Sequence, residues 1–443
     1  MNTQPVPVSQ LLVWRRAIQG LFNQHPFNLL SDLGKRTEPI LVFRVAGEKI
    51  YFFNEPDLVK EVLVTCHAKL RKGRGLDRVK QTLGNGLLTS EGDLHRQQRR
   101  IIQPVFNHRN LQAYADPMIA RVSRVSASSK DSQPVNMTAA MMALTLSIVC
   151  QTLFGADVES ETHRVGELMT KITEAFPLLL SPFAGFLEKI GVAKLREAAA
   201  ARVELHGIVQ RMIAERRSSR NQGSDLLSLL FAAQDQETGN GMSEQQLEVT
   251  TIFMAGHETT ANALAWTFYL LAQHPGFDRE LRVQLCHVLG ERQPELAQLP
   301  KLTLLDQLIH ESLRLYPPAW SIGRRAIEDV QIGSAEISKG SLLVVSPWTM
   351  HRSERFYAHP TEMRPERWTE AFRRQLPKYA YFPFGGGPRQ CIGEGFAWME
   401  LKLLLAVLLR DWRVELIPGQ NIRPKPAITL RSNHPIRVVV HRA

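Results

Sequence analysis

The amino-acid sequence predicts a mainly α-helical fold with a small β-rich region. From Leu94 to about Leu315 the apolar residues recur mostly at helical spacing, in long amphipathic runs. Strand-like patterns occur before and after this stretch. The chain of 443 residues has no internal repeat and no low-complexity linker, and 44% of its residues are hydrophobic. We therefore expect one large domain over residues 1–443 with an extensive core.

The β-rich part is predicted in three places. Ile40–Val45 and Ile50–Phe53 are typical of a hairpin around residues 46–49, and Glu55-Pro56-Asp57 then begins a helix to about Val64. Further strands are expected at Val330–Ile332, Leu342–Val345, Ala427–Leu430 and Ile436–Val440. The β-rich part thus covers about 35–65 and 320–350 and the C-terminal strands, and the helical part about 90–315 and 391–412.

Two helical stretches are distinctive. Ser243, with Gln246 three residues later, predicts a capping box at the start of the longest helix, which ends near Gln273. Ser132–Ala156 carries no charge and resembles a transmembrane segment in length. Its Gln133, Pro134 and many small side chains favour a buried core helix, so no transmembrane anchor is expected.

Charge and cysteine content limit the function classes. The formal net charge is +11, yet there is no zinc finger, aromatic-rich RNA motif or compact basic tract, so nucleic acid is not an expected partner. Between Asp93 and Asp116 there is no acid but several arginines (Arg96, Arg99, Arg100, Arg109). They form either a solvated face or a docking patch for an acidic protein.

The four cysteines are widely scattered, and no CxxC pair occurs. This argues against a disulfide framework and for a reducing compartment. The N-terminus lacks the apolar region of a secretory signal, so we expect a cytoplasmic protein.

One cysteine lies in a segment that points to chemistry. Cys391 follows three glycines in Phe384-Gly-Gly-Gly-Pro-Arg-Gln-Cys391-Ile-Gly393 and precedes a helical run at Phe396–Leu409. An ordinary buried cysteine in a surface loop is one interpretation. The other is a thiolate ligand for a metal that brings its remaining ligands, as haem does. Glycines would let the loop lie against a porphyrin, and Arg389 could bind a propionate.

Three further patterns place polar groups on helices. Ala255-Gly-His-Glu258-Thr259-Thr260 lies in the middle of the longest helix, where it is either a tolerated glycine kink or a groove with an acid and a hydroxyl. Glu311 and Arg314 share one helix face, as do His95 and Arg99. Each pair alone could be an ordinary surface feature.

Together these segments resemble the cytochrome P-450 family in motif and in order, over nearly the whole chain. The Cys391 segment is similar to its haem-binding signature, and Ala255–Thr260 to its oxygen-activation motif. Glu311-x-x-Arg314 with Pro365-Glu366-Arg367 is similar to its Glu-x-x-Arg and Pro-Glu-Arg segments.

The resemblance implies the family's triangular, mostly α fold with a small β region, and a b-type haem held by Cys391. It implies Glu258 and Thr259 as the proton-relay pair and a Glu311–Arg314–Arg367 network that locks nearby loops. His95, Arg99, Arg324 and Arg389, with Phe384, would bind the haem, although the family more often has tryptophan at the His95 position. Adjacent Arg325 leaves the choice of Arg324 open.

The implied activity is oxidation of a lipophilic small molecule, such as a terpenoid, carotenoid or fatty acyl chain, by a monomeric haem-thiolate monooxygenase. It would use O2 and electrons from NAD(P)H through a separate ferredoxin or flavodoxin and its reductase. The expected pocket walls are Gly75–Leu88, Pro177–Leu187, Ile252–Ala255, Ala319–Ile322 and Thr429–Ser432. The alternatives are a haem-thiolate isomerase or peroxygenase, and a non-catalytic haem sensor or lipophile carrier.

Overall fold

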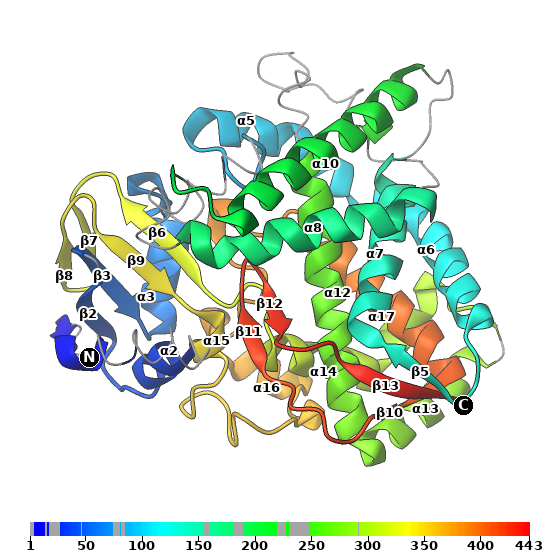
Figure 1. Ribbon diagram of the computed structural model, residues 1–443. Helices are drawn as coiled ribbons and strands as arrows, with labels where there is room; N and C mark the ends of the chain where they lie inside the picture. Colours follow the sequence, from blue (N-terminus) through cyan, green and yellow to red (C-terminus); the bar gives the residue numbers. More distant parts are fainter. Residues whose placement is uncertain are drawn as a thin grey trace. The chain divides into compact units, whose positions relative to one another are not determined.

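The computed structural model describes residues 4–13, 16, 27–45, 47–73, 80, 85–154, 159–180, 189–218, 227–229, 249–290 and 292–443 (Figure 1). The backbone divides into two compact units, each built from separate stretches of chain. Unit 1 comprises Met1–Arg78, His310–Cys391 and Arg423–Asn433. Unit 2 comprises Val79–Ile309, Ile392–Ile422 and His434–Ala443.

Unit 1 is organised around a six-stranded mixed sheet with the order β1-β2-β3-β9-β6-β4. Its strands are β1 (Val6–Pro7), β2 (Ile40–Val45), β3 (Glu48–Phe53), β9 (Leu342–Val345), β6 (Ile322–Ala326) and β4 (Leu70–Lys72). β2 and β3 form the predicted antiparallel hairpin, in which Ile40 pairs with Phe53. β9 joins β3 in parallel and β6 antiparallel.

Alternate residues of the hairpin fill two separate cores, as the two faces of a strand require. Ile40, Tyr51 and Phe53 pack with buried residues of α3 (Pro56–Lys60) and of the π-helical turn η1 (Glu61–Thr65). Leu41 and Phe52 pack on the other face with Val8, Val13 and Leu33. Because both faces are covered, this sheet is a rigid platform for the segments attached to it.

The remaining elements of unit 1 are short. They are helices α2 (Phe27–Gly34), α15 (Pro347–Met350) and α16 (Glu370–Gln375), the 3-10 turns η2 (His67–Lys69), η5 (Pro365–Arg367), η6 (Lys378–Ala380) and η7 (Gly387–Arg389), and the hairpins β7 (Val330–Ile332)–β8 (Ala335–Ile337) and β11 (Pro424–Pro426)–β12 (Leu430–Ser432).

Unit 2 is mainly helical. It contains α5 (Gly92–Ile102), η3 (Gln103–Phe106), α6 (His108–Ser128), α7 (Met137–Phe154), α8 (Glu159–Leu180), α10 (Ala193–Ser218), α12 (Val249–Gln273), α13 (Pro275–Leu289), η4 (Leu296–Lys301) and α17 (Glu394–Asp411). α14 (Thr303–Leu315) begins here and contributes its last residues to unit 1. A sheet of β10 (Trp412–Leu416), β13 (Arg437–Arg442) and β5 (Gln133–Asn136) completes the unit.

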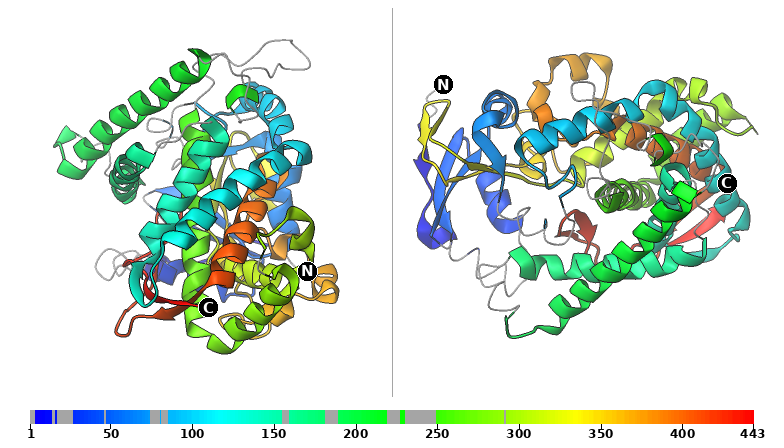
Figure 2. Two further views of the ribbon diagram at one scale, coloured as in Figure 1. Left: turned by 90° about the vertical axis from the view of Figure 1, so that its right-hand side faces the viewer. Right: turned by 90° about the horizontal axis from the view of Figure 1, so that it is seen from above.

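α12 and α17 are the central helices of unit 2. α12 packs against α7 and α17, and α17 packs against α6, so that α17 lies between α6 and α12 (Figure 2). From Leu403 to Leu409 every residue of α17 is buried, which is the pattern of a helix enclosed on all sides. The mainly α fold with a smaller β region is therefore confirmed.

Several local predictions are borne out with shifted boundaries. β3 begins at Glu48, two residues before the predicted strand, and the helix after Glu55 continues to Thr65 only through the π-helical turn. The uncharged stretch 132–156 contains β5 and the buried helix α7.

No helix among the described residues is long and apolar enough to cross a membrane. Ser243 and Gln246 lie outside the described residues, and α12 is described from Val249.

One strand prediction is wrong. Ala427–Leu430 was expected to be extended, but the chain turns between β11 and β12, and the Ala427 N–H donates to the Thr429 carbonyl at 3.1 Å. Isoleucine and threonine at this turn gave a strand-like pattern. Leu430 is buried in a cluster with Phe27 and Trp348, so tertiary packing overrides the local β propensity.

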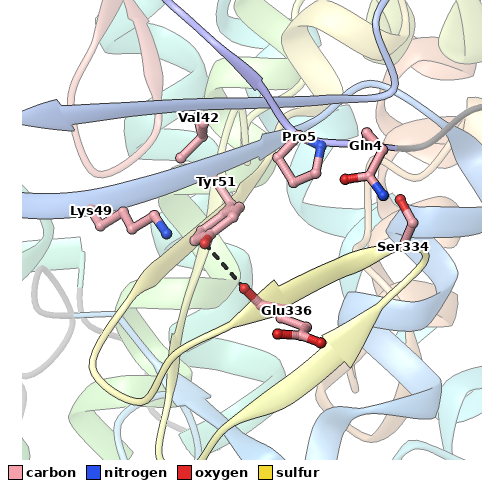
Figure 3. A pocket seen from close by; sticks show the side chains of 7 residues that line it. All are labelled: Gln4, Pro5, Val42, Lys49, Tyr51, Ser334 and Glu336. Carbon is pink, nitrogen blue, oxygen red and sulfur yellow. Dashed lines mark hydrogen bonds between the residues drawn. The ribbon is translucent and has the colours of Figure 1, made fainter.

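A surface pocket of about 350 Å³ opens on unit 1 (Figure 3). It lies among Gln4 and Pro5, the β2–β3 hairpin (Val42, Lys49, Tyr51) and the β7–β8 hairpin (Ser334, Glu336). The Tyr51 hydroxyl donates to the Glu336 carbonyl at 3.3 Å across it. None of the candidate site residues lines this pocket.

Candidate active site

The Cys391 segment is a compact loop in unit 1. The Cys391 N–H donates to the Phe384 carbonyl at 3.0 Å, which closes the loop, and the Gln390 N–H donates to the Gly387 carbonyl at 2.9 Å. Gly385 and Gly387 have φ of +75° and +67°, a region that other residues adopt at a cost. The loop conformation therefore depends on glycine at these two positions.

Two of the glycines also allow close packing within unit 1. A Cβ on Gly387 would lie 2.1 Å from the Leu63 carbonyl oxygen of η1, and one on Gly386 would lie 2.6 Å from the Tyr379 ring. The sequence predicted glycines for contact with a porphyrin. The structure adds a second reason, because the rear of the loop is pressed against η1 and η6.

The thiol of Cys391 distinguishes between the two interpretations of this loop. Cys391 is exposed, whereas Cys150, a core cysteine, is 1% exposed. α17 begins three residues later at Glu394, and the N-terminus of a helix favours a thiolate. Phe384 and Arg389 flank the loop as half-buried side chains. An accessible thiol with an apolar ring and a guanidinium nearby fits a haem, and it does not fit an ordinary buried cysteine.

The predicted Glu311–Arg314–Arg367 network is confirmed. Glu311 and Arg314 are both 0% exposed, and the Arg314 Nε and Nη2 donate to the two Glu311 oxygens at 2.8 Å each. The Arg367 Nε and the Trp368 Nε1 also donate to Glu311, at 3.2 and 2.8 Å. Arg314 donates further to the carbonyls of His351, Pro360 and Glu362. A buried pair with every lone pair engaged is costly to break at any one member.

His351 connects this network to the chain before the Cys391 loop. Its backbone carbonyl accepts from Arg314, and its Nε2 accepts from the Phe382 N–H at 3.0 Å. Burial and the neighbouring cations Arg314 and Arg352 hold the pKa of His351 well below its usual range. A neutral imidazole with its proton on Nδ1 can accept from Phe382 at all physiological pH values. No sequence pattern indicated this role.

The structure distinguishes Arg324 from Arg325 on β6. Adjacent strand residues point to opposite faces of a sheet. Arg325 donates to Glu48 at 2.6 Å and to the Gly340 carbonyl at 3.0 Å, so its guanidinium is held elsewhere. Arg324 is 7% exposed and lies two residues after Ile322, whose side chain approaches Gly385 of the Cys391 loop. Arg324 is therefore the better propionate candidate.

The Ala255–Thr260 segment lies within α12 in unit 2. The Thr259 hydroxyl donates to the Ala255 carbonyl at 2.7 Å, and the Thr260 hydroxyl to the Gly256 carbonyl at 3.2 Å. Both bonds satisfy a hydroxyl one turn back along the helix. Glu258 is 2% exposed. A Cβ on Gly256 would lie 3.3 Å from the Val149 side chain, so glycine at this position permits α12 to pack closely on α7.

Glu400 is a further buried acid in unit 2, and it lies outside the sequence motifs described above. It is 0% exposed on α17, and neither of its carboxyl oxygens has a hydrogen bond of good geometry to a described residue. Burial raises the pKa of Glu400 to about 8, only partly offset by the Thr260 hydroxyl. The carboxyl is thus held largely protonated at neutral pH, next to the threonine that follows Thr259. An acid in the run Phe396–Leu409, where Lys402 is the only other charged residue, was the available sequence signal.

His95 and Arg99 lie one turn apart on α5 of unit 2, as predicted. His95 is 4% exposed and Arg99 is half-buried, so both are on the inner side of the helix. On the outer side, Arg96 pairs with Asp93, and Arg100 is exposed, as is Arg109 on α6. The inner pair and the outer arginines are therefore two separate sets of cations.

The expected pocket walls are only partly described. Residues 75–79 and 81–84 of the first wall, and 181–187 of the second, lie outside the described residues. Ile252–Ala255 belongs to α12. Ala319–Ile322 leads into β6, and Thr429–Ser432 belongs to the β11–β12 hairpin, both in unit 1.

Comparison with known proteins identifies the class. The family model for cytochrome P450 matches residues 2–439. The chain is 34% identical to cyclooctatin synthase from Streptomyces melanosporofaciens, over 95% of this chain and 92% of the relative. It is 31% identical to cyclooctat-9-en-7-ol 5-monooxygenase from the same species (93% and 88% covered) and 31% identical to pentalenene oxygenase from Streptomyces avermitilis (94% and 92%).

The fold and these relatives define a haem-dependent oxidoreductase. The chain belongs to the cytochrome P450 family, as a bacterial-type member. Membership implies a haem iron, O2, a lipophilic substrate and a redox partner.

Gly387→Ala tests the packing of the Cys391 loop. Gly340→Ala is the control, because Gly340 has φ of +88° but open space around its Cβ position. The control should lose about 1 kcal/mol of stability from the backbone alone. Gly387→Ala should lose about 1–3 kcal/mol more, because the Leu63 carbonyl must move. Thermal unfolding measures both, and equal losses would contradict the close contact.

Glu400→Gln tests the buried acid. Because the pKa of Glu400 is raised from its usual value near 4.5 to about 8, folding holds the proton, and the stability of the native protein falls as pH rises through this range. The glutamine variant lacks this dependence. The difference between its melting temperature and that of the native protein should therefore become more positive as the pH rises from 5 to 8. Glu197→Gln, at an exposed site on α10, should run parallel to the native curve. A parallel curve for Glu400→Gln would show that its carboxyl ionises normally.

Proposed function

We propose that the protein is a haem-thiolate monooxygenase that hydroxylates a terpenoid-class lipophile. The observation that carries the proposal is the exposed Cys391 thiol, in its glycine-rich loop, in a chain that belongs to the cytochrome P450 family. The overall reaction consumes O2, two electrons and two protons, and yields the hydroxylated product and water. When bound, the haem supplies O2 binding and O–O cleavage, which the thiolate favours by donating electron density.

Cys391 holds the iron in this proposal, and five residues hold the porphyrin. Phe384 offers an apolar surface beside the thiolate, while Arg389, Arg324, His95 and Arg99 are the propionate partners. Arginine is suited to this role because its planar fork binds a carboxylate through two hydrogen bonds. Arg324 is preferred over Arg325 because Glu48 already holds the latter.

Glu258 and Thr259 deliver the two protons. The Thr259 hydroxyl donates to the Ala255 carbonyl, which fixes its position while its lone pairs can still accept a hydrogen bond. Glu258 is the adjacent acid from which protons are replenished through water. The carboxyl of Glu400 lies next to Thr260. Because it is protonated at neutral pH, it adds no further negative charge near this part of α12.

The relatives favour a terpenoid over a carotenoid or fatty acyl chain. Two of the three carry names that specify oxygenation of cyclooctat-9-en-7-ol and of pentalenene. Electrons would come from NAD(P)H through a ferredoxin or flavodoxin and its reductase. The exposed arginines at 96, 100 and 109 are suited to bind such an acidic partner. The absence of disulfides among the four cysteines supports a cytoplasmic location, and we expect a monomer.

The competing functions predict different behaviour. A haem-thiolate isomerase or peroxygenase would not need the Glu258–Thr259 pair. A haem sensor or lipophile carrier would bind ligands without turnover when ferredoxin, reductase and O2 are supplied.

The spectrum of the reduced, carbon-monoxide-bound protein tests the iron ligand. We expect the Soret band of a thiolate-ligated haem, lost in Cys391→Ser and kept in Cys286→Ser, which alters another exposed cysteine. A histidine-type band in the native protein would exclude Cys391 as the ligand. The same sample, titrated with terpenes, reports binding by its spin-state shift.

Thr259→Ala tests proton delivery. Using the terpene with the largest spin-state shift, we expect the fraction of NAD(P)H electrons recovered in product to fall about tenfold or more, with hydrogen peroxide in its place. Thr267→Ala is the matched control, because Thr267 makes the same backbone bond at 2.7 Å in the same helix. Equal coupling in the two variants would exclude a proton-relay role for Thr259.

Charge reversal tests the docking surface. The triple change of Arg96, Arg100 and Arg109 to glutamate should slow ferredoxin-driven reduction, most strongly at low salt, because exposed charges are screened as salt rises. A control reverses Lys194, Arg202 and Arg211, exposed on α10, with the same change in net charge. Equal slowing by both would indicate a net-charge effect and no specific surface.

A further inference from the structure

Trp320 connects two segments of unit 1 that are more than a hundred residues apart in sequence. It lies between the end of α14 and the start of β6. Its indole Nε1 donates to the Ala427 carbonyl at 3.0 Å, at the turn between β11 and β12. A second bond of the same kind lies beside it, since the Leu430 N–H donates to the Pro318 carbonyl at 3.0 Å. The turn is therefore fastened to the segment that contains Trp320.

The backbone of Trp320 is fastened on its other side. Its carbonyl accepts from the Ser346 hydroxyl at 2.8 Å and from the Trp348 N–H at 3.2 Å, both at the start of α15. Ser346 caps α15, and β9 ends at Val345, the residue before it. Trp320 is thus anchored to the central sheet of unit 1 before it reaches the β11–β12 turn.

A row of stacked side chains supports the Trp320 ring. The Trp320 and Phe27 rings are nearly perpendicular, with centroids 5.5 Å apart, and Phe27 of α2 stacks on Trp348 with a centroid separation of 4.2 Å. The guanidinium of Arg352 lies 3.4 Å over the Trp348 ring. Phe27, Trp348 and Leu430 are buried together (α2, α15 and β12 in Figure 1). Planar groups in a stack have few alternative packings, so the indole N–H has a fixed direction.

The turn that Trp320 holds has one outward residue. Ala427 and Thr429 are 9% and 7% exposed, whereas Ile428 between them is more accessible. The Ala427 N–H donates to the Thr429 carbonyl at 3.1 Å, which makes the turn tight. Because the Ala427 carbonyl is the acceptor for Trp320, the indole bond fixes the orientation of Ile428 at the tip.

We propose that Trp320 is a positioning residue that sets which carbon of the substrate is oxidised, by fixing the 427–429 turn. The proposal rests on the proposed function and on the walls that the sequence predicts for its substrate pocket, Ala319–Ile322 and Thr429–Ser432. Trp320 makes these two walls one rigid piece. A terpenoid hydrocarbon has few polar groups, so its orientation depends on the shape of apolar walls more than on hydrogen bonds. A wall that shifts by a fraction of an ångström presents a different C–H bond.

The first measurement addresses the fastening without any substrate. Trp320→Phe keeps an aromatic ring against Phe27 and removes the Nε1 donor. Trp398→Phe is the control, because it makes the same change to an indole on α17, outside the cluster that contains Trp320 and Leu430. Hydrogen exchange of the Leu430 amide in the haem-loaded protein should be about tenfold or more faster in Trp320→Phe, and nearly unchanged in the control. Unchanged exchange in Trp320→Phe would overturn the proposal.

The second measurement addresses selectivity. Limonene, which has several inequivalent allylic C–H positions, is supplied with ferredoxin, its reductase and NADPH. We expect the ratio of hydroxylated regioisomers to change about threefold or more in Trp320→Phe, with the carbon-monoxide spectrum unaltered. The control should keep the native ratio. A native ratio in Trp320→Phe despite faster exchange of Leu430 would overturn the selectivity role.

The two arms also separate failure of this inference from failure of the proposed function. If the native protein oxidises no terpene, including those that shift its spin state, the monooxygenase proposal fails and the selectivity role fails with it. If the native protein oxidises limonene and the ratio does not respond to Trp320→Phe, only the inference fails.

Discussion

The buried pair of Glu311 and Arg314 is the interaction on which the organisation of unit 1 depends. Two charges at 0% exposure are tolerable only when all their hydrogen-bonding capacity is used. Here Glu311 accepts from Arg314, Arg367, Trp368 and the Arg364 N–H, and Arg314 donates to three carbonyls between residues 351 and 362. The last turn of α14 therefore determines the path of an irregular segment that regular secondary structure does not stabilise.

The position of the Cys391 loop depends on this network and on close packing. His351 connects the two, because its carbonyl accepts from Arg314 and its imidazole accepts from the Phe382 N–H just before the loop. Gly387 packs against the Leu63 carbonyl, where there is no room for a side chain. A thiolate ligand must be held in one place to set the properties of the iron, and a loop alone is too mobile for this. The polar network behind the loop and the glycines against η1 supply the rigidity that the loop lacks.

The sequence predicted what depends on local patterns and specific spacing. The helical region, the first hairpin, the Glu311–Arg314–Arg367 network and the loop around Cys391 all follow from residues near one another or from motifs that match the family. The β11–β12 turn was mistaken for a strand because its isoleucine and threonine have high β propensity, while the contacts of Leu430 and Trp320 that impose the turn come from distant segments. Glu400 was missed because burial, which perturbs its carboxyl, is a property of the folded core.

The same contrast separates the chemistry of this protein from its selectivity. The residues proposed for the chemistry, Cys391 and the Glu258–Thr259 pair, lie in motifs with fixed spacing, so a chain can be assigned to the family without knowledge of what it oxidises. The residues that would orient an apolar substrate lie on turns and segment ends, and their positions are set by bonds such as the one from Trp320 to Ala427. Such bonds join a side chain to a backbone carbonyl, which every residue has. The sequence therefore shows the donor, here a tryptophan, but gives no indication of which residue supplies the acceptor. We therefore expect the selectivity of this protein to be a property of tertiary contacts between irregular segments.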